Sequence, residues 1–156
     1  MKEKMLEHPT VAQPVPKGFH TVTPFLVVRD TVKLLDFIRD AFGGETTSLL
    51  KHESGKVMHA SAKIGDSNLL FSDADERMKA LQSMLYLYVE DVDDTYQRAI
   101  AAGAESIREP NNEFYGDRSA GVKDTWGNQW WIATHFEDVD EEEMKKRADA
   151  FDKATR

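Results

Sequence analysis

A small set of polar side chains among many aromatic ones could bind or act on a ligand in this chain of 156 residues. His59 is a candidate general acid or base, because imidazole titrates near neutral pH. Arg118 could pair with an anionic group and Gln129 could exchange hydrogen bonds. Four aromatic residues could stack on a flat molecule: Phe25, Tyr86, Tyr88 and Trp131. We therefore expect an apolar or aromatic ligand that carries one anionic or carbonyl group.

Each of these side chains also has a plainer interpretation. His59 could orient a ligand without catalysing a reaction, or it could lie on the surface. Arg118 directly follows Asp117, and an Asp–Arg pair commonly holds a turn in place. Trp131 could belong to the core rather than to a binding surface, whereas Trp130, of opposite phase in the strand, should face the helices.

The sequence contains two similar modules at a spacing of sixty-one residues. Residues 63–71 correspond to residues 124–132, and residues 28–30 correspond to residues 89–91. Each copy is predicted to contain one strand, one helix and three further strands, a βαβββ module, over residues 19–73 and 83–136. Repeated units of this kind predict paired modules, so we expect an α+β fold in which residues 19–136 form one domain.

Hydrophobic periodicity and turn residues predict the bounds of the elements. In module one we expect strands over 19–29, 46–53, 56–64 and 68–72, with a helix over 31–42 between Asp30 as N-cap and Gly43. In module two we expect a strand over 83–89, a helix capped by Asp91 or Asp93 that ends at Ala102, and a short strand over 106–109. A loop then begins at Pro110, and two strands follow. Residues 1–18 form an arm and residues 137–156 a terminal helix.

Strand alternation predicts which residues line a ligand cleft. We expect the helices to cover one side of each sheet, so that the other sides face each other. The predicted lining of module one is Thr23, Phe25, Val57, His59, Ser61 and Leu70. The corresponding lining of module two, sixty-one residues later, is Met84, Tyr86, Arg118, Ala120, Val122 and Trp131, with Tyr88, Gln129 and Ala133 in the same phases.

The composition argues against several classes of partner and site. A formal net charge of -8 disfavours nucleic acid or an anionic membrane as the main partner. The chain lacks an apolar run long enough for a membrane span, and its first residues lack an apolar signal core. The absence of cysteine excludes disulfides, thiolate catalysis and zinc–sulfur sites. We expect a cytoplasmic protein.

Three stretches give this sequence a resemblance to a known family: residues 23–30 (TPFLVVRD), 58–66 (MHASAKIGD) and 115–128 (YGDRSAGVKDTWGN). The chain resembles the vicinal oxygen chelate superfamily, which includes glyoxalase I, bleomycin-resistance proteins and extradiol dioxygenases, and within it the PhnB-like branch. The resemblance covers about residues 19–151. It implies a paired βαβββ fold with the helices outside a concave mixed sheet, and a homodimer.

The resemblance also implies where a metal would bind in the metal-dependent members. The four corresponding positions hold Thr23, Leu70, Met84 and Trp131, which offer no set of oxygen or nitrogen ligands. We therefore expect no metal or other cofactor, and a protein that binds a small aromatic or amphipathic molecule. Two alternatives stay open: a metal-dependent lyase, isomerase or dioxygenase with displaced ligands around His59, and a structural or interaction protein whose cleft its own side chains fill.

Overall fold

The computed structural model describes residues 12–156, so most of the predicted N-terminal arm lies outside the described residues. Module one contains β1 (Phe25–Val28), α1 (Thr31–Phe42), β2 (Glu45–Lys51), β3 (Val57–Ile64) and β4 (Ser67–Asp73), with sheet order β1-β4-β3-β2. Module two contains β5 (Met84–Tyr88), α2 (Val92–Ala101), β6 (Glu105–Asn112), β7 (Asp117–Lys123) and β8 (Gln129–His135), with order β5-β8-β7-β6. The helix α3 (Glu141–Thr155) follows. The prediction of an α+β fold with paired βαβββ modules is confirmed.

The repeat extends to the pairing of the strands. Phe25 pairs with Leu70 between the parallel strands β1 and β4, and Tyr86 pairs with Trp131 between β5 and β8, at a shift of sixty-one on both strands. The predicted N-caps are confirmed, since Asp30 accepts a hydrogen bond from the Lys33 backbone N–H in α1 and Asp91 acts in the same way in α2. Both modules therefore share one local design.

Two strands differ from the prediction around proline residues. β1 begins at Phe25 rather than at residue 19, directly after Pro24, which has no N–H to donate to a strand pairing. β6 continues through Pro110 to Asn112, where a loop was predicted. This continuation is possible because β6 is an edge strand and its register with β7 is irregular between Arg108 and Asn111.

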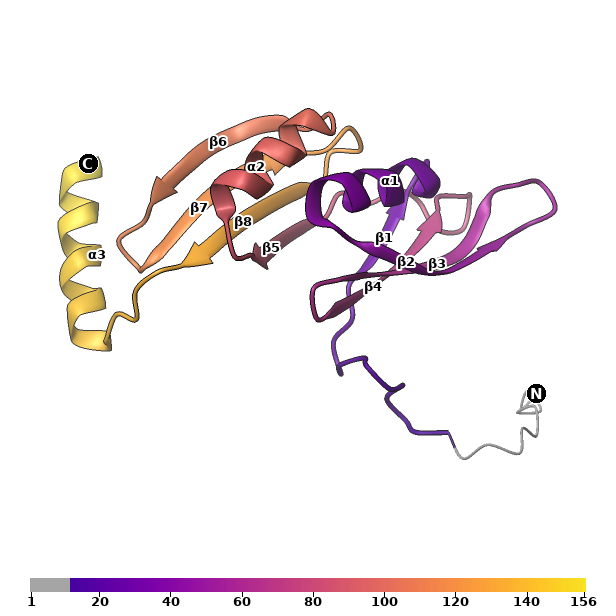
Figure 1. The fold of residues 1–156 in the computed structure, drawn as a ribbon, viewed down its shortest axis with the longest axis horizontal. Coiled ribbons are helices and arrows are strands. Elements are labelled where there is room, and N and C mark those ends of the chain that lie inside the picture. Colours follow the sequence, from indigo (N-terminus) through magenta and orange to yellow (C-terminus); the bar gives the residue numbers. More distant parts are fainter. Residues whose placement is uncertain (1–11) are drawn as a thin grey trace.

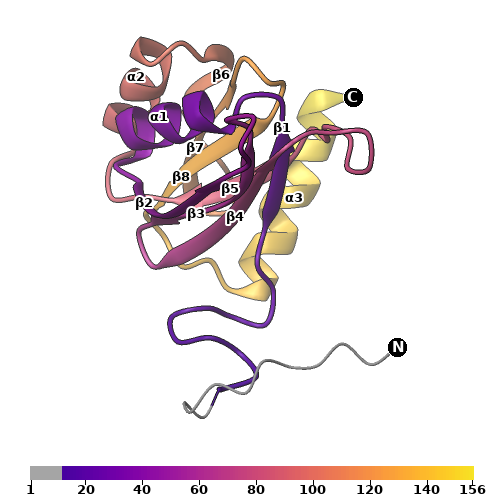
Figure 2. The ribbon, with the colours of Figure 1, turned by 90° about the vertical axis from the view of Figure 1, so that its right-hand side faces the viewer.

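The two modules lie side by side, and α1 and α2 contact each other on the same side of both sheets (Figure 1). Figure 2, turned by 90°, also shows the two helices together on one side of the strands. We call the uncovered sides the helix-free faces. Our expectation that these faces would be opposed across a cleft within one chain is wrong, because packing between α1 and α2 leaves both faces on the other side of the molecule.

Trp130 joins the cores of the two modules. It is fully buried, as predicted, and its ring centroid lies 5.0 Å from that of Phe42 and 6.4 Å from that of Phe37, both in α1. Its indole Nε1–H donates to the buried carboxylate of Asp124 at 2.8 Å. Asp124 also accepts hydrogen bonds from the backbone and side-chain N–H groups of Asn128, which fixes the turn before β8.

The helix α3 lies beyond the end of module two (Figure 1) and has no buried residue. Arg147 holds it in place by contacts with the carboxylate of Glu137 and the backbone oxygen of Phe114, and within the helix it pairs with Glu143. The ring of Phe151 packs against that of Phe114 at a centroid distance of 5.2 Å. Across residues 12–156, no helix is both long and apolar enough to cross a membrane.

Replacing Asp124 should destabilise the whole domain. The Asp124→Ala substitution leaves the buried Trp130 and Asn128 donors without an acceptor, so we expect the free energy of unfolding to fall by about 2–4 kcal/mol. Urea denaturation followed by tryptophan fluorescence measures the change. Asp66→Ala is the control, because this exposed residue lies in the corresponding turn of module one, where its side chain contacts Ser67. Equal effects of the two substitutions would contradict the anchoring role of Asp124.

Candidate functional site

A row of four residues crosses the helix-free face of module two. Strand pairing places Tyr86, Trp131, Gly121 and Arg108 next to one another on β5, β8, β7 and β6. A Cβ atom at Gly121 would lie 2.8 Å from the Trp131 ring, so only glycine lets the indole rest on the backbone there. The Arg108 guanidinium carbon lies 5.1 Å from the centre of the Trp131 ring, and Trp131 Nε1–H donates to Gln129 at 3.1 Å.

A buried carboxylate anchors the aromatic residues at one end of this row. Asp117 is only 3% exposed, and its Oδ2 accepts hydrogen bonds from the hydroxyl groups of Tyr86 and Tyr88 at 2.8 and 3.0 Å. Its Oδ1 lies 2.7 Å from Nδ1 of His135, whose Nε2 lies 2.7 Å from the exposed Asp138. The rings of Tyr86 and Tyr88 are thereby fixed with their centroids 5.3 Å apart.

The hydrogen bonds of this cluster shift the pKa values of its members. Burial tends to raise the pKa of Asp117, but the hydrogen bonds from His135, Tyr86 and Tyr88 together outweigh it, so the pKa is lowered. The hydrogen bonds to Asp117 and then to Asp138 raise the pKa of His135. Burial, followed by the bond to Asp117, raises the pKa of Tyr86. The cluster therefore contains a charged carboxylate held by neutral tyrosine hydroxyls and a histidine biased toward its protonated form.

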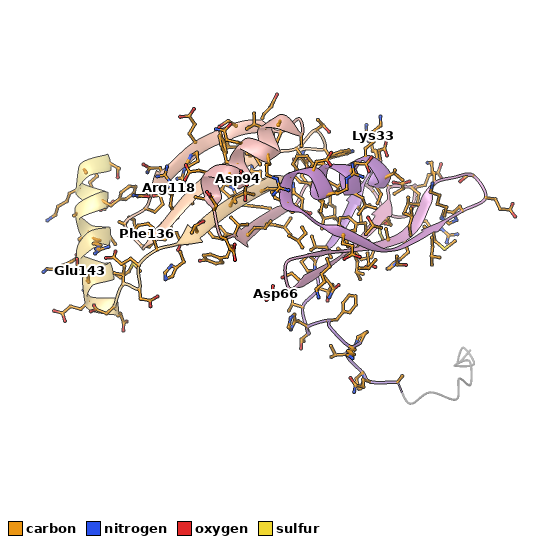
Figure 3. All side chains as sticks on the ribbon, in the orientation of Figure 1. Lys33, Asp66, Asp94, Arg118, Phe136 and Glu143 are labelled. Carbon is orange, nitrogen blue, oxygen red and sulfur yellow. The ribbon has the colours of Figure 1, made fainter. Side chains whose placement is uncertain are left out.

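The face predicted for Arg118 is wrong, and so are those predicted for Ala120 and Val122. Ala120 and Val122 belong to the core under α2. Arg118 donates two hydrogen bonds of 2.9 Å to Asp93 in α2, and Figure 3 labels it close to this helix. The structure therefore does not bring Arg118 together with Tyr86, Tyr88 and Trp131.

A single extra residue in a turn explains this error. Lys63 pairs with Asn68 across the β3–β4 turn, whereas Lys123 pairs with Gln129 across the β7–β8 turn, which is longer by one residue. The spacing between modules is thus sixty residues in β7 and sixty-one in β8. Because side chains alternate along a strand, a shift of one residue moves each of them to the other face.

The correct spacing identifies site residues that the prediction missed. Asp117, Ser119 and Gly121 in β7 point to the helix-free face, as does Arg108 in β6. His135 lies on the same face at the end of β8, next to Asp117. The sequence contained a signal for this set. The glycines at which the two helices end, Gly43 and Gly103, are sixty residues apart, one fewer than the spacing of the repeat.

The predicted lining of module one is brought together only in part. Phe25 and His59 contact each other on its helix-free face, with ring centroids 6.4 Å apart. Val57 is instead part of the core, so its predicted face is wrong. Thr23 precedes β1, where its hydroxyl donates to the backbone oxygen of His20. His59 and Trp131 lie in different sheets.

A cavity of about 770 Å³ lies between the two modules along the free edge of β5. Module one contributes the turn between β3 and β4, with Asp66, and module two contributes β5 and α2, with Asp94 (Figure 3). Its apolar walls include Phe42 and Trp130. Tyr86 and Tyr88 line this cavity and also belong to the aromatic surface, so the two features are continuous.

The four positions implied for a metal do not fit one. Leu70, Met84 and Trp131 carry side chains without a carboxylate. The indole ring of Trp131 also lies on Gly121 and donates its N–H to Gln129. Within residues 12–156, no group of three or more histidine, aspartate or glutamate side chains has the arrangement of a metal site. The donor set therefore gives no basis for a step through a metal at these positions.

The pKa of His135 should depend on Asp117. We expect a midpoint above 6.5 in an NMR titration of the His135 ring, and a lower midpoint in the Asp117→Asn variant, which lacks the negative charge. Because the pKa of folded His135 is raised, its contribution to stability is complete below about pH 6.5 and is lost as the pH rises through the folded value. Because the pKa of folded Asp117 is lowered, its contribution to stability is complete above its ordinary value of 3.8. That contribution is lost as the pH falls through the folded value.

Asp93→Asn is the matched control for this titration. Asp93 pairs with Arg118 on the opposite face, so this change should leave the His135 midpoint in place. A midpoint at or below 6.5 in the unaltered protein would show that the two carboxylates do not hold the proton on His135.

Comparison with known proteins identifies one family and several relatives. A family model described as Glyoxalase/Bleomycin resistance protein/Dioxygenase superfamily matches residues 18–132. Uncharacterized proteins of Mycobacterium bovis and Mycobacterium tuberculosis are 28% identical over 135 residues, which cover 80% of this chain and 89% and 79% of the relatives, respectively.

Solved structures share the fold at low sequence identity. TioX from Micromonospora sp. ML1 is 21% identical with a TM-score of 0.63, and the match covers 74% of this chain and 99% of TioX. A PhnB protein from Bacillus cereus is 16% identical with a TM-score of 0.57, covering 74% and 99%. A glyoxalase/bleomycin resistance protein/dioxygenase from Nocardioides is 20% identical with a TM-score of 0.57, covering 85% and 91%.

Proposed function

Because the chain belongs to the glyoxalase/bleomycin resistance protein/dioxygenase superfamily, we propose that it binds a small aromatic or amphipathic molecule on the helix-free face of module two. The observation that carries this proposal is the exposure of a fixed aromatic surface. Tyr86 and Tyr88 are 45% and 66% exposed, although their hydroxyl groups are anchored on a buried carboxylate, and Trp131 lies beside Tyr86. Exposed apolar groups that are held rigidly are typical of binding surfaces.

The available contacts are sufficient for useful affinity. Each well-buried aromatic contact contributes about 1–3 kcal/mol, and the rigid anchoring of the rings reduces the entropy lost on binding. Contacts with Trp131, Tyr86 and Tyr88 together can therefore support binding in roughly the micromolar range. The cavity beside β5 gives a larger ligand room to extend from Tyr86 and Tyr88.

The proposal includes a homodimer. Phe25 of module one and Met84 and Tyr88 of module two are 42%, 68% and 66% exposed on faces that lie on the same side of the molecule. A second copy is the simplest cover for so much apolar surface, and it would also place Phe25 and His59 of one chain near a partner's site. A cytoplasmic location stays a prediction.

Trp131→Ala should weaken binding of a neutral aromatic probe, 2-naphthamide, about tenfold or more, because it removes the largest ring of the surface. The affinity of both proteins is measured by isothermal titration calorimetry, because the variant has no Trp131 signal. In the unaltered protein, the indole N–H signals of the three tryptophans are also followed by NMR. In the unaltered protein the Trp131 signal should shift and that of the buried Trp130 should not.

Trp126→Phe is the matched control for this experiment, because Trp126 lies in the turn before β8 and away from the probe. The folded state of Trp131→Ala is checked by its urea midpoint. An unfolded Trp131→Ala protein would show that Trp131 belongs to the core, and an unshifted Trp131 signal would show that the site is not a binding surface.

Light scattering during size-exclusion chromatography should give the mass of two chains. A Tyr88→Asp/Met84→Asp double variant places charges on the apolar face, so it should shift the equilibrium toward the single chain. Lys33→Asp/Arg39→Asp is the control, because both residues are exposed on α1, on the helix side. A single-chain mass at high protein concentration would contradict the dimer.

A further inference from the structure

The charged groups on the helix-free face of module two differ in how far ligands can reach them. The side chain of Arg108 is 41% exposed, whereas those of Glu113 and Asp117 are 10% and 4% exposed. Glu113 pairs with Arg108 at 2.9 Å and Asp117 pairs with His135. A molecule that lies on Trp131 and Tyr86 therefore meets a guanidinium group, while the carboxylates of Glu113 and Asp117 lie behind the surface.

Arg108 is held in position by one side of its guanidinium group. Its Nη2 contacts both the carboxylate of Glu113 and the hydroxyl of Ser119. Its Nη1 has no hydrogen-bond partner among residues 12–156, which leaves two donors for a ligand. The guanidinium carbon lies over the Trp131 ring, 5.1 Å from its centre, so these donors lie at the Arg108 end of the aromatic surface.

The other basic groups near this face are already engaged. Arg118 lies on the opposite side and both ends of its guanidinium group pair with Asp93. Both ring nitrogens of His135 contact carboxylates. Lys123 lies 3.7 Å from Glu105. Arg108 is therefore the basic group best placed to meet an anion on this surface.

We propose that Arg108 makes the site selective for an aromatic acid, by pairing with the acidic group of a molecule whose ring lies against Trp131 and Tyr86. Charge-assisted hydrogen bonds from a pre-positioned guanidinium group favour planar anions such as carboxylates. The inference rests on the proposed function and adds the charge of the ligand to it. The formal net charge of -8 repels anions in general, so a preference for an anion must arise locally.

The test compares two probes of nearly equal shape. At about pH 7, 2-naphthoate is an anion and 2-naphthamide is neutral. We expect the unaltered protein to bind naphthoate about tenfold more tightly than naphthamide, as measured from the Trp131 indole signal. In Arg108→Met this ratio should fall to about one, with naphthamide affinity changed much less than naphthoate affinity. Arg118→Met, the matched control on the opposite face, should keep the tenfold ratio.

Removal of Arg108 leaves the largely buried side chain of Glu113 without its counter-charge, a change that can unfold the single variant. The Arg108→Met/Glu113→Gln double variant removes both charges and keeps the test possible. A ratio near one in the unaltered protein, or a tenfold ratio that survives in the double variant, would overturn the inference and leave aromatic binding in place. Failure of both probes to shift the Trp131 signal would instead overturn the proposed function.

Discussion

The contact between the two helices decides what the rest of this molecule can present to a ligand. Each βαβββ module has one helix, and that helix covers one side of its sheet. Because α1 packs on α2 and on Trp130 of module two, the two modules share one core on the helix side. Neither helix can then cover the opposite side, and both sheets keep an uncovered face with partly exposed aromatic residues.

The uncovered face of module two is rigid because polar groups fix its aromatic rings. A buried carboxylate holds the hydroxyl groups of Tyr86 and Tyr88, and the missing side chain of Gly121 gives the Trp131 ring a flat base. An unpaired carboxylate at this depth would be costly, so the hydrogen bonds of Asp117 with two tyrosines and His135 are needed for the fold as well as for the surface. The same contacts thus serve stability and the proposed recognition.

The two tryptophans that follow each other in β8 illustrate how one strand serves both sides. Trp130 points toward the helices, where Asp124 satisfies its N–H and α1 packs against its ring. Trp131 points away from the helices, where Gln129 accepts its hydrogen bond and Arg108 lies over its ring. Alternation along the strand separates a core residue from a surface residue within two consecutive positions.

The amino-acid sequence correctly predicted the repeated module, the bounds and N-caps of α1 and α2 and the place of Trp130 in the core, and it supplied the aromatic residues of the candidate site. These features depend on local periodicity, on turn residues and on capping side chains, which act over a few positions. Tertiary structure decided that Arg108 rather than Arg118 lies beside Trp131, because one additional residue in the β7–β8 turn reverses every side chain of β7 relative to the repeat. It also decided that the helix-free faces lie on one side, since packing between α1 and α2 joins residues far apart in the chain, which local patterns do not encode.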